Sequence, residues 1–381
     1  MPARHRIAAL AVAAAAVAAA GITTLGLAAA PGALARPAGS AAYLSQFRKL
    51  TTVASTVPRN GDVNPYGIVV IPNSTGRLRA GNVLISNFNN KANLQGTGKT
   101  LVQITPDGHR TLFAQINPSK LPGSCPGGVG LSTALEVLPG GWVVVGSVPS
   151  RNGQAATAKA GCLIVLNSRG QVKETISGYG INGPWDSAAV TRGRLAFLFV
   201  SNVLKGTVAA NGKVVRQGYV LRLTLRLHRF GPPSVVASTV IGSGYPQRTD
   251  PLAFVLGPTG LGLGQNGMLY VAETLTSRIF AIPNAVNRLG SAGQGALVTK
   301  GGELNMPLGL AIAPNGHILT VNGDDGKIVE TTPAGAQIFS RFLDTSGFPV
   351  GAGALFGLAV LPGVGGVYYV DDATNTLGLL H

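Results

Sequence analysis

The sequence has few charged residues, few aromatic residues and only two cysteines. Charged side chains make up 12% of the 381 residues and aromatic ones 6%, whereas 45% are hydrophobic. This composition is not that of a disordered chain, and the length suffices to bury a large core. Acids are the scarcest charged type, 14 against 30 lysines and arginines, so the formal net charge is +16. This excess favours anionic partners, but no compact basic cluster with interleaved aromatics indicates nucleic acid binding.

The N-terminus differs in kind from the rest of the chain. Arg4, His5 and Arg6 precede an alanine-rich apolar stretch over residues 7–30, and the small-x-small triplet 33–35 follows it. This order of features predicts a signal peptide over residues 1–35 and an extracellular or cell-envelope location. The alternative is a retained membrane anchor, because about 24 apolar residues could span a bilayer. No later segment is long and apolar enough to do so.

Export would expose Cys125 and Cys162 to an oxidising compartment, where a disulfide between them is expected. Two buried free thiols are the alternative. A zinc site is not indicated, since no histidine or second cysteine lies at ligand spacing beside either residue.

Glycine, by contrast, is abundant. The 54 glycines and 24 prolines separate short runs of Val, Ile, Leu and Tyr, which is typical of many short strands joined by tight turns. One unit recurs: an apolar strand, a Pro/Gly/Asn turn and a second apolar strand ending in a polar residue, most clearly in PLGLAIAPNGHILTVN at 307–322. Such copies begin near residues 64, 132, 183, 250, 307 and 355. Six copies with a period of about 50 to 60 residues predict an all-β, six-bladed β-propeller over residues 49–381.

Most copies continue with two further strands, so each blade is expected to have four antiparallel strands, A to D from the centre outward. The sixth copy ends at His381 after three strands. Residues 49–55 are predicted to supply its missing outer strand and to close the ring, with residues 36–48 as a linker. A monomer is expected.

The pattern P-x-G-φ-x-φ-x-P-x-G-x-φ-φ-V followed by Asp, Asn or Glu resembles NHL-repeat propellers over most of residues 42–381. Gluconolactonase-type lactonases and streptogramin lyases share this topology. The copies at 307 and 250 match best, and those at 132 and 183 depart from the pattern. The resemblance implies the fold but no particular activity, because this scaffold hosts unrelated functions.

Strand polarity places the D-to-A and B-to-C loops on one face, the top face, and the A-to-B and C-to-D turns on the bottom face. The top loops of the first three blades are long, and binding residues often lie on such loops of a rigid scaffold. They carry basic residues and no acid, which predicts an anion-binding rim; solvated loop charges are the alternative. The predicted rim consists of Lys91, Lys99, Arg151, Lys159, Lys205 and Arg216.

Polar residues are also expected on the top face, where inner strands begin and B strands end. The resemblance to gluconolactonase-type enzymes implies an Asn/Asp/Glu set for a divalent cation such as Ca²⁺. The candidates are Asn87, Asp186, Asn202, Asp250, Glu273 and Asn322. The alternative is that each of these side chains caps a turn of its own blade.

None of the five histidines is expected in the top funnel, which disfavours the acid–base role that a streptogramin lyase requires. The sequence therefore favours a secreted, non-enzymatic propeller that binds a ligand or protein, such as an anionic polymer, on its top face. A metal-dependent lactonase- or esterase-like hydrolase is the main alternative. An extracellular redox or sugar-oxidising propeller is a third.

Overall fold

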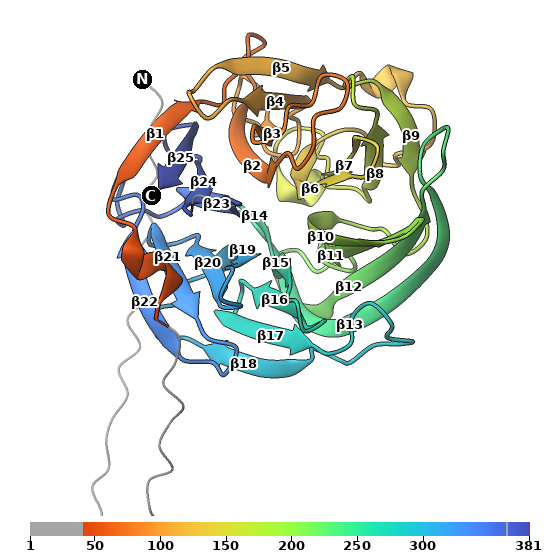
Figure 1. The fold of residues 1–381 in the computed structure, drawn as a ribbon. Helices are drawn as coiled ribbons and strands as arrows, with labels where there is room; N and C mark the ends of the chain where they lie inside the picture. Colours follow the sequence, from red (N-terminus) through yellow and green to blue (C-terminus); the bar gives the residue numbers. More distant parts are fainter. Residues whose placement is uncertain (1–40, 363–364) are drawn as a thin grey trace, which may run out of the picture. The chain divides into compact units, whose positions relative to one another are not determined.

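The computed structural model describes residues 41–362 and 365–381, so the predicted signal peptide lies outside the described residues. Six β-sheets surround a central axis like the blades of a propeller (Figure 1). The number of blades and their antiparallel strands confirm the prediction from the repeat. Within the two described segments, no helix is long and apolar enough to cross a membrane.

The first three blades follow one another from the orange to the green part of the chain in Figure 1. Blade 1 consists of β2 (Val63–Val70), β3 (Val83–Asn89), β4 (Thr100–Ile104) and β5 (Arg110–Gln115). Blade 2 consists of β6 (Leu131–Leu138), β7 (Trp142–Ser147), β8 (Cys162–Leu166) and β9 (Val172–Ile176). Blade 3 consists of β10 (Pro184–Arg192), β11 (Leu195–Asn202), β12 (Val215–Arg226), β13 (Ser234–Asp250) and β14 (Phe254–Leu256).

The last three blades complete the ring. Blade 4 consists of β15 (Pro258–Leu263), β16 (Leu269–Glu273), β17 (Arg278–Ile282) and β18 (Ala296–Lys300). Blade 5 consists of β19 (Pro307–Ile312), β20 (Ile318–Asn322), β21 (Lys327–Thr331) and β22 (Gln337–Phe342). Blade 6 consists of β23 (Leu355–Val360), β24 (Val367–Asp371), β25 (Thr376–Leu380) and β1 (Leu50–Ser55).

The N-terminal strand closes the ring as predicted. β1 pairs antiparallel with β25, with Leu50 opposite Leu380 and Ser55 opposite Thr376. The pairing leaves blade 6 with four strands, so its C strand is not an open edge.

Residues 43–47, predicted as part of a linker, belong to the packed body. The 3₁₀ turn η1 (Tyr43–Gln46) buries Tyr43 and Leu44, whose backbone N–H groups donate to the Glu330 carboxylate at 2.7 and 2.8 Å. Phe47 is buried beside them. The packed chain thus begins before β1.

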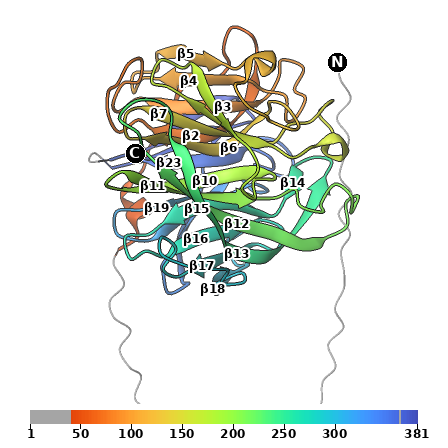
Figure 2. The same cartoon turned by 90° about the vertical axis from the view of Figure 1, so that its right-hand side faces the viewer.

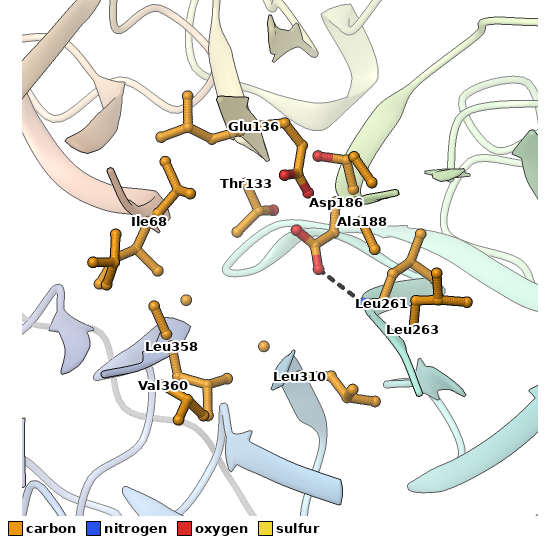
Figure 3. Close-up of a pocket in the computed structure, with 18 of the residues that line it drawn as sticks. Ile68, Thr133, Glu136, Asp186, Ala188, Leu261, Leu263, Leu310, Leu358 and Val360 are labelled. Carbon is orange, nitrogen blue, oxygen red and sulfur yellow. Dashed lines mark hydrogen bonds between the residues drawn. The ribbon is translucent and has the colours of Figure 1, made fainter. Parts of the chain in front are cut away.

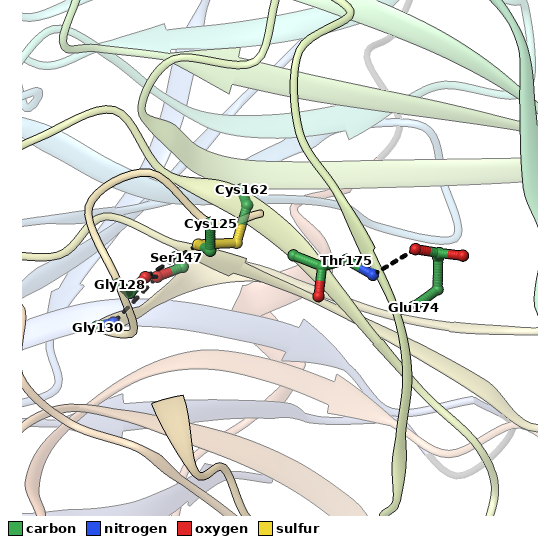
Figure 4. The surroundings of a disulfide bond; sticks show 7 residues. All are labelled: Cys125, Gly128, Gly130, Ser147, Cys162, Glu174 and Thr175. Carbon is green, nitrogen blue, oxygen red and sulfur yellow. Dashed lines mark hydrogen bonds between the residues drawn. A yellow bond between two sulfur atoms is a disulfide. The ribbon is translucent and has the colours of Figure 1, made fainter. Parts of the chain in front are cut away.

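The predicted disulfide joins Cys125 to Cys162, with their Cα atoms 5.2 Å apart (Figure 4). It ties the loop that enters blade 2 to the first residue of β8. In the chain-entropy model a bridge that closes a loop of this length stabilises the fold by about 3 to 4 kcal/mol.

Glycine at the P-x-G position allows the inner strands to approach one another at the axis. A Cβ on Gly309 would lie 2.1 Å from the carbonyl oxygen of Phe356, and one on Gly357 would lie 2.3 Å from that of Tyr66. No side chain fits at such distances. Glycine in the repeat therefore sets the diameter of the ring at this level.

Blade 3 departs from the four-strand pattern. β13 is unusually long, and β14 pairs with its end, Asp250 opposite Phe254 and Arg248 opposite Leu256. In the edge-on view of Figure 2, β14 lies on the opposite side of the ring from the C-terminus. Because the C-terminus ends a C strand, β14 lies on the top face.

Candidate functional site

An aromatic cluster fills the axis on the top face. Tyr66 stacks on Phe88 and Phe356 with ring centroids 4.6 and 4.0 Å apart, and Trp185 packs edge-on against Tyr66 and Phe88. Phe254, from β14, packs edge-on against Phe88 at 5.3 Å. All five side chains are buried. The centre of the top face is therefore apolar and filled.

Beyond this cluster, toward the bottom face, lies a channel of about 340 Å³ that the inner strands of all six blades line (Figure 3). Its wall is mostly aliphatic, and Pro362 in the A-to-B turn of blade 6 marks its bottom end. The aliphatic side chains labelled in Figure 3 are Ile68, Ala188, Leu261, Leu263, Leu310, Leu358 and Val360.

Two carboxyl groups stand in this apolar channel. Glu136 of β6 and Asp186 of β10 point toward each other, and both are partly exposed to the channel (Figure 3). Asp186 Oδ2 accepts a hydrogen bond from the backbone N–H of Leu261 at 2.9 Å. Within the described part of the chain, the Glu136 carboxylate has no hydrogen-bond or ion-pair partner. Among the described residues, no lysine, arginine or histidine lines the channel.

Burial in this apolar wall changes how the pair titrates. Desolvation raises the pKa of Glu136 to about 8, and the charge of Asp186 raises it further in the same direction. Desolvation likewise raises the pKa of Asp186 to about 7, against the lowering effect of the Leu261 and Ser187 N–H groups. The channel therefore gains negative charge as the pH rises through neutrality.

A third polar group faces the acids. Thr133 of β6 is only 9% exposed, and its Oγ1 has no hydrogen-bond partner among the described residues. Its hydroxyl points into the channel toward the two carboxyl groups (Figure 3). A buried hydroxyl without a partner is costly, so this group is available to a ligand.

Glu136 was not predicted as a site residue, and Asp186 was predicted to lie on the top face. Asp186 instead faces the channel, because it occupies the P-x-G position that Gly67, Gly260, Gly309 and Gly357 hold in other blades. Glu136 stands three residues before the proline of its turn, where the corresponding residues are Val69, Ala311 and Ala359. An acid at a position where the other copies have small or apolar residues is a signal that could have identified the site.

The other metal candidates are hydrogen-bonded within the top face. Asn87 donates to Thr56 O and Thr100 Oγ1, and Asn202 Oδ1 accepts from Asn182 N. Glu273 is fully buried and accepts from the backbone N–H groups of Leu275 and Thr276. Asn322 donates to Glu303 O and to the Asp325 carboxylate. Asp250 accepts from Leu252 and Ala253 N–H and pairs with Arg248 at 2.8 Å.

These contacts match the turn-capping alternative more closely than a cation site. No hydrogen bond joins any two of the six candidates, and no group of three or more His, Cys, Asp or Glu in the described segments could hold a metal ion. The Oδ1 atoms of Asn87 and Asn322 are buried without partners, but Ca²⁺ takes six to eight oxygen ligands. The residues present do not fit a shared divalent cation, and no metal-dependent step is derived from them.

The rim residues lie on loops that hold one another in place. Gln95 Nε2 of the blade 1 loop donates to Leu252 O at 2.6 Å, and Ser150 N of the blade 2 loop donates to Gly96 O at 2.9 Å. Gly212 N of the blade 3 loop donates to Thr249 Oγ1 at 3.1 Å. The top loops of blades 1 to 3 thus form one connected surface.

All the predicted rim cations except Lys99, which is partly buried, are exposed on this surface. None of the six forms a salt bridge with an acid in the described segments. Lys205 and Arg216 line a surface cavity of about 620 Å³ together with Asn182 and Tyr219, and no acid lines it.

Comparisons with known proteins agree with the fold of six-bladed propellers. A solved structure of a putative gluconolactonase superimposes with a TM-score of 0.53 at 16% identity, over 87% of this chain and 91% of that one. A gluconolactonase from Xanthomonas campestris gives 0.51 at 13% identity, over 87% and 88% of the two chains. A streptogramin B lyase gives 0.52 at 14% identity, over 87% and 97%.

At these identities the likeness establishes the fold and no activity. No protein-family model matches the chain, and no curated protein sequence matches it. The NHL-like pattern of the sequence is consistent with these structural neighbours.

Proposed function

We propose that this chain is a secreted, non-enzymatic propeller that binds an anionic polymer through the basic rim of its top face. The observation that carries the proposal is the cavity beside Lys205 and Arg216, which brings two cations together without a neutralising acid. Unpaired positive charges on a fixed surface attract polyanions and raise their rate of association.

The acids of blades 4 to 6 weaken the positive potential of the basic rim less than their number suggests. Glu273 is fully buried and Asp371 is 6% exposed. Desolvation raises the pKa of Asp371 to about 6 and that of Asp372 to about 7, which reduces their negative charge near neutral pH. These three acids therefore weaken the positive potential of the rim less than exposed, fully ionised carboxylates would.

The hydrolase alternative has less support. The axis of the top face holds aromatic rings, and Glu273 accepts hydrogen bonds from the backbone of its own turn. A saturable, stoichiometric rise of the melting temperature on addition of CaCl₂, together with hydrolysis of a sugar lactone, would favour that alternative instead.

The test is a variant that carries K91S, R151S, K205S and R216S. Binding to alginate, a polyuronate, is measured by biolayer interferometry at about 20 mM and about 150 mM NaCl, with dextran as the neutral comparator. We expect wild-type affinity to fall with salt and the variant to bind at least tenfold more weakly at low salt. Its melting temperature should stay within about 2 °C of wild type, because exposed charges contribute little to folding.

A matched control removes four basic side chains from the bottom face: K173S, R194S, R226S and R229S. These residues are also exposed, and the change in net charge is the same. The control should retain alginate binding. Equal losses in both variants would mean that net charge alone, and not the rim, governs the interaction.

A further inference from the structure

We propose that the central channel is a second binding site, for a primary organic ammonium ion held by Glu136, Asp186 and Thr133. This site is separate from the basic rim in place and in charge. It opens toward the bottom face, since the aromatic cluster closes its other end.

The two acids are costly in this position. A carboxylate in an apolar wall is unfavourable unless a proton or a cation neutralises it. Among the residues that line the channel no basic side chain does so, and Glu136 has no partner within the described segments. A bound ammonium ion would replace a proton and offset one of the two negative charges.

The number and kind of polar groups favour an ammonium ion over a metal. A primary ammonium has three N–H donors, and the side chains that line the channel include two carboxylates and the hydroxyls of Thr133 and Ser187 as acceptors. Ca²⁺ takes six to eight oxygen ligands, so water would have to fill the positions that these side chains leave open.

The aliphatic part of the channel wall indicates the chemistry of the rest of the ligand. Across the channel from the acids lie Ile68, Leu358 and Val360 (Figure 3). These side chains would cover an alkyl chain, whose burial adds to affinity in proportion to its apolar area. The ligand class is therefore an alkylamine with an unbranched aliphatic body that enters from the bottom face.

The probe is n-hexylammonium chloride, titrated into the wild-type protein by isothermal calorimetry at about pH 8.5, with n-hexanol, hexanoate and CaCl₂ as comparators. We expect hexylammonium to bind one to one and the comparators to bind at least tenfold more weakly. Affinity should rise about tenfold or more from about pH 6 to about pH 9. The carboxyl pair ionises in that window while an alkylamine, with a pKa of about 10.4, stays protonated, and no other titratable group lines the channel.

Two near-isosteric variants locate the site. The double variant E136Q/D186N should lose at least tenfold in affinity together with the pH dependence, and T133V should lose about threefold or more. E303Q, which removes an exposed acid in the loop between blades 4 and 5, should bind as wild type does. A thermal melt of each variant verifies that it is folded.

Three results would overturn the proposal. Hexanol that binds as tightly as hexylammonium would show a merely apolar cavity. Undiminished binding by the folded E136Q/D186N variant would place the amine elsewhere. Stoichiometric calcium binding that this variant abolishes, without any binding of hexylammonium, would identify a metal site.

Discussion

Glu136 and Asp186 illustrate how one residue can change the chemistry of a repeated structure. Each stands where other blades have glycine, alanine or valine, and each is partly buried in a channel without a basic residue. Their type and their place in the repeat are visible in the sequence. Their mutual orientation was not predictable, because it depends on how blades 2 and 3 meet at the axis.

These two carboxyls also make a prediction about stability. Folding raises the pKa of Glu136 to about 8 and that of Asp186 to about 7, so between about pH 4 and pH 8 the folded state binds more protons than the unfolded state. Their contribution to stability is therefore greatest below about pH 4 and is lost as the pH rises through 7 and 8. The melting temperature should fall by several degrees from about pH 5 to about pH 9, measured by calorimetry without ligand.

In the E136Q/D186N variant, the melting temperature should fall less between about pH 5 and about pH 9. A residual slope is expected from Asp371 and Asp372, whose pKa values are also raised. E303Q is the control, since hydrogen bonds from Lys327 and Ser340 lower the pKa of Glu303 and take it out of this window. A double variant with the full wild-type slope would show that the channel acids titrate normally.

At the scale of elements, a buried carboxylate helps to anchor the segment before β1. Glu330 of β21 is fully buried, accepts from the backbone of Tyr43 and Leu44, and lies 2.6 Å from His317 Nδ1. Blade 5 thereby holds the turn that leads into the closing strand of blade 6.

The variant E330Q should loosen this attachment. The glutamine side chain has one acceptor oxygen and one NH₂ donor group, whereas the carboxylate has two acceptor oxygens. In the variant, one of the two backbone N–H groups would therefore face the NH₂ group and lose its acceptor. We expect a loss of about 1 to 3 kcal/mol in urea unfolding and faster tryptic cleavage after Arg48 and Lys49. The exposed control E303Q should change stability by less than about 1 kcal/mol. Wild-type cleavage rates in E330Q would contradict this role of Glu330.

The regular blades could be predicted from the sequence because each repeats its own turns and strand pairs. The features that depart from the repeat, β14 and η1, depend on long-range contacts and on an irregular strand. β14 is only three residues long and pairs with the end of an unusually long β13, and η1 is held by Glu330, 286 residues from Leu44. Strand periodicity carries no information about such contacts.

At the scale of the whole molecule, the aromatic cluster joins blades that are far apart in the chain. Tyr66 and Phe88 belong to blade 1, Trp185 to blade 3 and Phe356 to blade 6, and Phe254 reaches the axis from β14. The individual aromatic residues are visible in the sequence, but their meeting point exists only once the ring has closed. For this reason this aromatic centre was not predicted from the sequence, which indicated polar residues on the top face.

The cluster should therefore stabilise the closed ring, and Phe88 is its most informative member. It is fully buried and contacts Tyr66, Trp185 and Phe254 with ring centroids 4.6, 5.7 and 5.3 Å away. F88A removes these contacts and leaves a cavity at the axis, so urea unfolding should show a loss of about 3 to 5 kcal/mol. F230A makes the same substitution at a side chain that is 83% exposed and should change stability by less than about 0.5 kcal/mol. Similar losses in the two variants would show that the axis is not a principal source of stability, and that the blades depend mainly on their contacts with neighbours around the ring.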